Sequence, residues 1–265
     1  MANSKNQTSV ARGNRRAVGR PIDLLRTLTV LKAAYEAGNL GGTQHELFPD
    51  VPADSRERAL YFTLAPALNY QRKSEGLWSA ALKTYLDPDT RFVFDPQASS
   101  RGLDAFRVAL TRYALAVQPF KQSAIWFTIV QTLRSDFGGD PRVLFEACGN
   151  DVGLIKDFVV SRKRDFPYLA GPKLLNYWLY MVSCFTAIDL KNRQSISIIP
   201  DLHITRATAR LGLATSGELR TAQQVEQVWA LALLGTGEAP CDYHAPLWRW
   251  SRAGFPSVET LAEAL

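Results

Sequence analysis

Apolar residues recur at the spacing of an α-helix along almost the whole chain from Pro21 onward. Leu60, Leu64 and Leu68, for example, repeat every four residues, and Pro and Gly punctuate the helical stretches at 137–141. The short β-branched stretch 194–199 is compatible with an extended segment or a loop. We therefore expect a mostly α-helical fold. The expected helices cover residues 21–37, 55–68, 77–86, 103–117, 121–136, 141–147, 151–164, 174–188, 201–211 and 219–234, followed by a C-terminal segment that contains Trp248 and Trp250.

Length and composition narrow the class of protein. A chain of 265 residues favours one large domain or two closely packed lobes. Apolar residues make up 46% and charged residues 21%, which excludes a disordered or fibrous chain. The most apolar stretch, 174–188, is too short to cross a membrane, and the N-terminus has no apolar signal segment. We expect neither a membrane-spanning nor a secreted protein.

The net charge of +6 is concentrated at the N-terminus. Residues 1–20 contain five basic residues and no acidic one, so 26 basic and 25 acidic residues remain in 21–265. The first twenty residues are polar and predict a basic disordered tail, followed by one helical domain over 21–265. Such a tail can hold phosphate without sequence preference, and the alternative is a solubilising tail with no other role.

Three widely spaced cysteines, Cys148, Cys184 and Cys241, limit the cofactors. Their number and spacing argue against a disulfide framework and a zinc knuckle, and indicate a reducing compartment. A four-cysteine iron–sulfur cluster lacks its fourth ligand. We therefore expect no metal and no cofactor.

Lys173 follows a short Gly-Pro turn between two expected helices. Gly171 can adopt a positive φ, and Pro172 suits the first position of a helix. Such a turn presents the free N–H groups of the next helix, where a DNA phosphate can bind. The helix dipole and the apolar helix behind Lys173 disfavour its ammonium form, as an amine nucleophile requires. The alternative is a solvated lysine after a helix–helix turn.

Asp201 stands directly before a second expected helix. Its position predicts an N-cap, and Arg206 and Arg210 share one face of that helix at i, i+4 spacing. Capping alone would explain the aspartate. Its combination with Lys173 favours a shared site.

The two segments together resemble the helix-hairpin-helix DNA glycosylase superfamily, which includes endonuclease III and the 8-oxoguanine DNA glycosylases. Gly171-Pro172-Lys173 matches the end of the family's Leu-Pro-Gly-Val-Gly-x-Lys hairpin, and residues 200–204 match its Val-Asp-x-His-Val segment. Residues 68–73 resemble the family's Leu-Ser-x-Gln-x-Thr stretch, and residues 137–141 its Gly-Gly-x-Pro element. The elements follow the family's order over roughly residues 45–250.

The chain departs from the family pattern in several places. Leu169 stands where the family has the first hairpin glycine, and an extra helix ending at 162–164 precedes the hairpin. Lys173 and Asp201 are 28 residues apart, a longer separation than in many members and closer to the archaeal 8-oxoguanine branch. The cysteine cluster of endonuclease III is absent.

The resemblance implies a fold, a chemistry and a partner. The fold is a two-lobed helical bundle with the hairpin near 166–174, expected to be monomeric and to bind double-stranded DNA that contains a damaged base. Base flipping exposes the target, Asp201 stabilises the charge on the sugar, and Lys173 forms an imine that leads to β-elimination. The expected DNA-binding residues are Gly171, Pro172, Asn69, Gln71, Arg72, His203 and Arg206, and the candidates for the base pocket are Trp178 and Trp248.

The resemblance leaves the substrate open. The favoured reading is a DNA N-glycosylase and abasic-site lyase that excises an oxidised base, with 8-oxoguanine first. It would act in the bacterial cytoplasm at the nucleoid, or in a eukaryotic nucleus or organelle. The alternatives are a glycosidase of the same fold acting on an oxidised pyrimidine or a modified nucleoside, and a non-catalytic nucleic-acid-binding protein that retains the hairpin.

Overall fold

The computed structural model describes residues 21–42 and 46–265, and the predicted basic tail of residues 1–20 lies outside them. The described residues form twelve α-helices and no β-strand. The prediction of a mostly helical fold is therefore confirmed. The α-helices are α1 (Pro21–Glu36), α2 (Arg56–Leu64), α3 (Ser74–Leu86), α4 (Gly102–Arg112), α5 (Pro119–Phe137), α6 (Pro141–Ala147), α7 (Val152–Ser161), α8 (Pro172–Phe185), α9 (Leu202–Arg210), α10 (Ala222–Ala232), α11 (His244–Arg252) and α12 (Val258–Glu263).

Short 3₁₀ segments connect several of these helices. One of them, at residues 193–195, overlaps the start of the β-branched stretch 194–199, which the sequence predicts to be extended or a loop. The rest of that stretch is irregular. The segments are η1 (Ala65–Leu68), η2 (Arg91–Phe94), η3 (Pro96–Arg101), η4 (Arg193–Ser195) and η5 (Pro240–Tyr243).

Several helices end earlier than the apolar pattern predicts, and α4 and α7 show why. α4 ends at Arg112 rather than at residue 117, because Ala114 adopts a left-handed backbone with φ 55° and turns the chain. α7 ends at Ser161 rather than at residue 164. Arg162, which caps it, binds Asp136 and Asp165 with its guanidinium and so belongs to the turn. Apolar periodicity finds helices well, but it does not show where a single residue leaves helical geometry.

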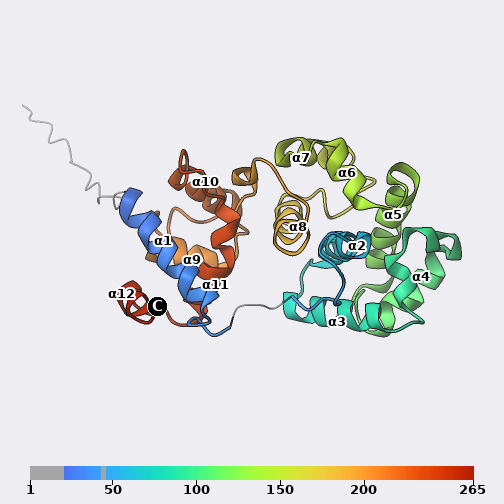
Figure 1. The fold of residues 1–265 in the computed structure, drawn as a ribbon, viewed down its shortest axis with the longest axis horizontal. Helices are drawn as coiled ribbons and strands as arrows, with labels where there is room; N and C mark the ends of the chain where they lie inside the picture. The colour runs from blue at the N-terminus through green and yellow to red at the C-terminus, as the bar shows by residue number, and fades with distance from the viewer. Residues whose placement is uncertain (1–20, 43–45) are drawn as a thin grey trace, which may run out of the picture.

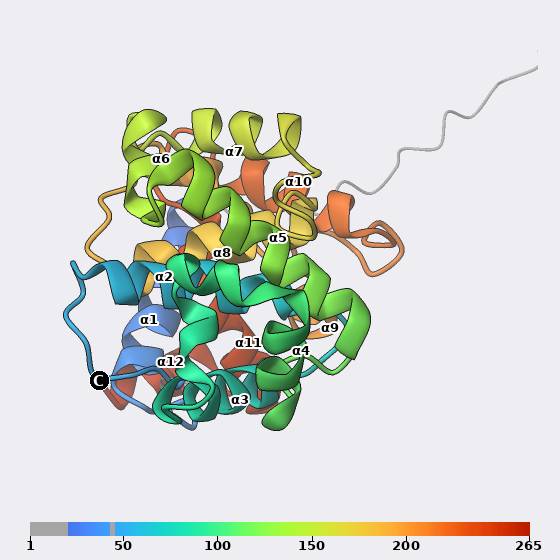
Figure 2. The ribbon, with the colours of Figure 1, turned by 90° about the vertical axis from the view of Figure 1, so that its right-hand side faces the viewer.

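The buried apolar side chains form two clusters. The first takes its members mainly from α2 to α8. The second joins α1 to α9, α10, α11 and α12. Figure 1 shows this arrangement, with the N-terminal helix α1 packed among the C-terminal helices and α8 seen end-on between the two groups. In the perpendicular view, helices α2 to α7 lie in front of α1, α9, α11 and α12 (Figure 2).

The non-helical stretch before α9 runs between the two clusters. Ile196 and Ile199 pack into the first cluster, while Ile198 packs into the second. Burial of these β-branched side chains on both sides fixes the path of the chain. Asp201 follows two residues after Ile199 and caps the start of α9. The stretch before it is linked to the start of α8 by the hydrogen bond between Asn176 and Ser197.

No helix among residues 21–42 and 46–265 is both long enough and apolar enough to span a membrane.

Candidate functional site

Lys173 lies in the first turn of α8, as the sequence predicts. Gly171 is the N-cap and Pro172 the first helical residue, and no side chain caps this helix. Both Pro172 and Lys173 are exposed. The apolar face of α8 therefore does not bury the Lys173 side chain, contrary to expectation, and the amine can reach a ligand from solvent.

The turn before Lys173 has a different geometry from the one predicted. Gly171 adopts φ −74°, an ordinary extended conformation, and the left-handed residue is Tyr168 with φ 66°. The expectation of a positive φ at Gly171 is wrong. A glycine is still useful at this position, because a Cβ on Gly171 would lie only 3.1 Å from the Tyr168 carbonyl oxygen. The Gly171 N–H donates to that oxygen at 2.9 Å, so the turn closes on itself just before the helix.

Asp201 is the N-cap of α9, as predicted. Its Oδ1 accepts a hydrogen bond from the Ile204 N–H at 2.8 Å, and its backbone is extended. The side chain is half-buried. The helix start thus fixes the orientation of the carboxylate, and this orientation is set by backbone groups rather than by a flexible partner.

Lys173 and Asp201 both influence the charge of a third residue, His244, the first residue of α11. Burial lowers the pKa of His244 to about 4; the Asp201 carboxylate opposes this shift and the Lys173 ammonium adds to it. Charges act on a neighbouring titratable group in this way over short distances. Lys173 and Asp201 belong to helices in different hydrophobic clusters, yet their charges both act on this one imidazole.

Asn176 links the two helix starts. This side chain, 5% exposed, lies one turn after Lys173 on α8. Its Nδ2 donates to the Pro172 carbonyl at 2.9 Å, and its Oδ1 accepts from the Ser197 N–H at 3.0 Å. A single amide thus ties the start of α8 to the stretch that carries Asp201.

The segment 69–72, which contains three of the expected DNA-binding residues, lies beside the turn. The Tyr70 ring is 41% exposed and its centroid lies 5.0 Å from that of Tyr168. Gln71 is exposed and has a left-handed backbone, with φ 53°. Asn69 Nδ2 donates to Ser74 Oγ at 3.2 Å. The sequence predicts a DNA contact over residues 69–72 and singles out Asn69, Gln71 and Arg72; Tyr70 is the aromatic member of this surface.

Arg72 has a structural role that the sequence did not suggest. Its guanidinium donates to the Leu115 carbonyl at 2.8 Å and to the Ala114 carbonyl at 3.3 Å, and burial lowers its pKa. It therefore anchors the left-handed turn after α4. The geometry does not support its expected role as a DNA contact.

His203 and Trp248 pack against each other at the α9–α11 contact. Nδ1 of His203 lies 3.0 Å from Ser251 Oγ, and the His203 ring lies 5.3 Å from the Trp248 ring. The guanidinium of Arg252 lies 4.9 Å from the Trp248 ring centroid. Both aromatic residues are only partly exposed, whereas Arg206 on α9 is exposed. Of the three predicted site residues His203, Arg206 and Trp248, Arg206 is the exposed one.

Trp178 belongs to the hydrophobic core. Its side chain has no exposed area, its Nε1 donates to Thr63 Oγ1 at 3.3 Å, and its ring packs against Phe145. A ring enclosed on all sides cannot stack on a base that enters from solvent. The expected place of Trp178 in a base pocket is therefore corrected by its burial.

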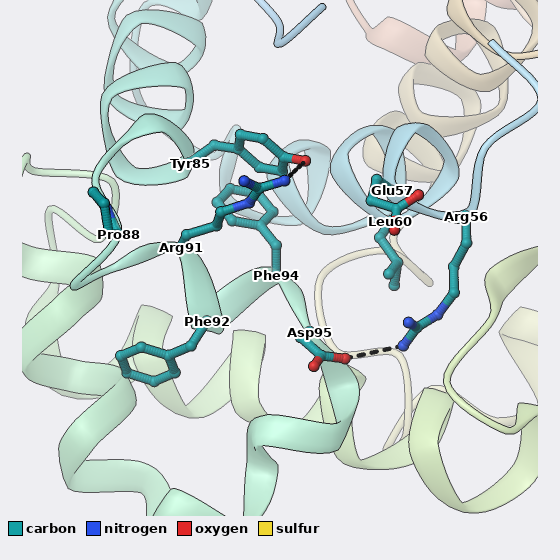
Figure 3. A pocket seen from close by; sticks show the side chains of 9 residues that line it. All are labelled: Arg56, Glu57, Leu60, Tyr85, Pro88, Arg91, Phe92, Phe94 and Asp95. Atoms are coloured by element: carbon teal, nitrogen blue, oxygen red, sulfur yellow. Dashed lines mark hydrogen bonds and ion pairs between the residues drawn. The ribbon is translucent and has the colours of Figure 1, made fainter. Parts of the chain in front are cut away.

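Two cavities lie away from this site. One of about 330 Å³ is bounded by α2, the end of α3 and η2, and its arginines are engaged within it (Figure 3). Arg56 pairs with Asp95 at 3.0 Å, and Arg91 donates to Tyr85 Oη at 2.7 Å. The other, of about 310 Å³, lies beside α6. Neither contains Lys173 or Asp201.

No cluster of three or more His, Cys, Asp or Glu residues within 21–42 and 46–265 has the arrangement of a metal site. Cys148 and Cys241 are buried, and Cys184 is exposed. The candidate chemistry of the described residues is that of an amine, a carboxylate and an imidazole.

Comparison of the chain with protein-family models and with curated proteins finds no match. The grounds for a function are therefore the residues themselves. Sequence reasoning identified Lys173 and Asp201. It missed His244 and Asn176, for which the available signal was only that His244 is one of three histidines in the chain.

Proposed function

We propose that this protein is a DNA N-glycosylase with abasic-site lyase activity, which excises an oxidised base, 8-oxoguanine first, from double-stranded DNA. The proposal follows the resemblance to the helix-hairpin-helix glycosylases. In it, the α7–turn–α8 unit serves as the hairpin, and the two hydrophobic clusters serve as the cores of two lobes. The damaged nucleotide enters between the two lobes, at the starts of α8, α9 and α11.

One observation carries the proposal: the Asn176 side chain ties the start of α8, where Lys173 lies, to the stretch that leads to Asp201. Lys173 and Asp201 are 28 residues apart in the sequence and start two separate helices. An exposed lysine or a capping aspartate alone has an ordinary structural explanation. An amine and a carboxylate whose helix starts are held together are the pair that nucleophilic displacement at a sugar carbon requires.

The chemistry assigns one task to each group. As the bond between C1′ and the base nitrogen breaks, positive charge develops on the sugar, and the Asp201 carboxylate stabilises it. Lys173 gives a proton to water, its amine then gives its lone pair to C1′, and the base departs with the electrons of the broken bond and takes up a proton. Opening of the sugar ring yields an imine. Loss of a C2′ proton then expels the 3′ phosphate by β-elimination.

The exposed surface supports a DNA contact at the same place. The start of α8 presents backbone N–H groups that no side chain caps, next to Lys173, and a phosphate fits such a helix start. Tyr70, exposed beside the turn, and its neighbour Gln71 are suited to fill the space left by a flipped nucleotide. Flipping costs a few kcal/mol, which ring stacking offsets in part.

Borohydride trapping tests this proposal. Borohydride reduces an imine to a stable amine, so the full-length protein should become covalently attached to a duplex that carries one 8-oxoguanine. We expect Lys173→Gln to abolish the adduct and Asp201→Asn to slow base release. Lys83→Gln, an exposed lysine on α3, is the matched control and should trap normally. Absence of an adduct with both 8-oxoguanine and abasic duplexes would overturn the proposal.

A further inference from the structure

The cavity of about 330 Å³ between α2, the end of α3 and η2 has walls that contacts within the protein already hold in place (Figure 3). On one wall Arg56 bonds Asp95 at 3.0 Å and the Gly139 carbonyl at 2.9 Å. The apolar part of the lining includes Leu60 and Phe94, which are 3% and 4% exposed. Sites for small molecules measure about 300–1,000 Å³. Because these walls are ordered without a ligand, a small molecule can bind with little rearrangement.

Arg91 offers this cavity a guanidinium that is oriented but mostly unused. Its Cζ lies 4.4 Å from the centroid of the Tyr85 ring, and its Nη2 donates to Tyr85 Oη at 2.7 Å. The Tyr85 ring is buried and packs edge-on against Phe94, which fixes the plane on which the guanidinium stacks. Among residues 21–42 and 46–265 no carboxylate pairs with Arg91, and most of its five N–H donors are unused. A guanidinium fixed in this way can hold a carboxylate by two parallel hydrogen bonds.

Glu57 brings an unpaired carboxylate to the same cavity. Figure 3 shows Arg91 on one side, with Glu57 and Leu60 on the other. Glu57 is exposed and lies in the first turn of α2, a place that suits a negative charge. In the described part of the chain it has neither a hydrogen bond nor an ion pair. Since Arg56 and Asp95 neutralise each other, the lining keeps one free charge of each sign beside an apolar surface.

We propose that this cavity binds a small zwitterion, an α-amino acid with an apolar side chain. Its carboxylate pairs with Arg91 and its ammonium with Glu57. Its side chain covers Leu60 and Phe94, which removes apolar area from water. An anion without an ammonium leaves Glu57 unpaired, and an amine without a carboxylate meets the like charge of Arg91. The inference goes beyond the proposed function and does not rest on it, because neither proposed catalytic residue lines the cavity.

The test is isothermal titration calorimetry of the full-length protein with three probes that share one ring. They are L-phenylalanine, 3-phenylpropionate, which lacks the ammonium, and 2-phenylethylamine, which lacks the carboxylate. We expect L-phenylalanine to bind most tightly. The propionate should bind up to about fivefold more weakly, the effect of one exposed ion pair. The amine should bind at least about tenfold more weakly, since it loses the charge-assisted bonds to Arg91.

Substitutions assign these differences to the two charged residues. Arg91→Gln should weaken L-phenylalanine binding about tenfold. Arg101→Gln is the matched control and should bind normally, because Arg101 is exposed, stacks on Phe92 and does not line the cavity. Glu57→Gln should weaken binding of L-phenylalanine but not of 3-phenylpropionate. A folding defect would weaken both probes alike, so this variant stays informative even if Arg91→Gln, which loses the stack on Tyr85, is destabilised.

Three results would overturn the inference: no binding of any probe, equal affinity for L-phenylalanine and 3-phenylpropionate, or equal losses in Arg91→Gln and Arg101→Gln. The measurements use no DNA. Their failure would therefore leave the proposed glycosylase activity standing, and a failure of borohydride trapping would leave this cavity's ligand standing.

Discussion

The helices that carry Lys173 and Asp201 begin in different ways. α8 begins without a side-chain cap, and its lysine extends into solvent. α9 begins with Asp201 itself as the cap, half-buried and bonded to the Ile204 N–H. A nucleophile has to reach and follow its carbon atom, whereas a group that stabilises a charge works best when it is already in place. The contrast between a mobile amine and a fixed carboxylate therefore suits the proposed chemistry.

Substitution of Asp201 gives the largest expected effect and separates its two roles. Asparagine caps a helix about as well as aspartate but has no charge. We expect Asp201→Asn to keep the wild-type unfolding free energy and to slow base release about 10²–10³-fold, as when a charge-stabilising group is removed from an active site. Urea denaturation and single-turnover base release measure the two quantities.

Asp201→Ala completes that comparison. It removes the cap as well as the charge, so it should lose about 1 kcal/mol of stability while its rate resembles that of Asp201→Asn. If alanine lowers the rate far more than asparagine at equal folded fraction, the carboxylate acts through the helix rather than through its charge.

Loss of the amide that links the two helix starts should have the next largest effect. Asn176→Ala leaves the Ser197 N–H without its partner in a partly buried place, which costs about 1 kcal/mol. The substitution also lets Asp201 shift relative to Lys173, so base release should fall even where the protein is fully folded. Ser183→Ala, which removes only a bond within α8, is the control. Equal effects of the two variants would show that Asn176 does not hold the site together.

Acid should destabilise the protein through His244. The unfolded chain binds a proton at the ordinary histidine pKa near 6.5, whereas burial delays protonation of folded His244 to about pH 4. The unfolded state therefore gains protons first as the pH falls, and stability drops between about pH 6.5 and pH 4. We expect a loss of about 1–2 kcal/mol, less than the full shift implies because the residue is partly exposed.

The same denaturation series on His244→Phe isolates this contribution. The variant should show a flatter dependence of stability on pH across that window, since the other titrating groups are common to both proteins. A steeper dependence in the variant would mean that His244 is protonated in the folded state, and that the Asp201 charge outweighs burial.

The fold was accessible from the sequence because its signals are local. The spacing of leucines and the positions of Pro and Gly place the helices, and Pro172 and Asp201 mark the starts of α8 and α9 through backbone chemistry that each residue carries with it. The ends of helices depend on single backbone angles, and Ala114 has no feature that announces φ 55°. The apolar pattern therefore predicts that a helix is present better than it predicts where the helix ends.

The sequence predicts only part of the candidate site, because the other residues come close to it only through tertiary contacts. His244 follows Asp201 by 43 residues and becomes relevant only when α11 packs on α9. The six tryptophans look alike in the sequence, yet Trp178 is fully buried and Trp248 is partly exposed. Apolar spacing shows which face of a helix is buried, but it cannot say which aromatic ring borders solvent.

Gly171→Ala should have the smallest effect and tests the α8 side of the contrast. Since Gly171 adopts φ −74°, alanine fits its backbone without strain. The new methyl group meets the Tyr168 carbonyl oxygen at 3.1 Å, a slightly tight contact, while the unfolded chain loses about 0.4–1 kcal/mol of conformational freedom in favour of folding. The two effects nearly cancel, so the unfolding free energy should change by less than about 1 kcal/mol. A loss well above that value would show that the Tyr168 carbonyl cannot give way to the added methyl group, and the start of α8 would then be as tightly specified as the start of α9.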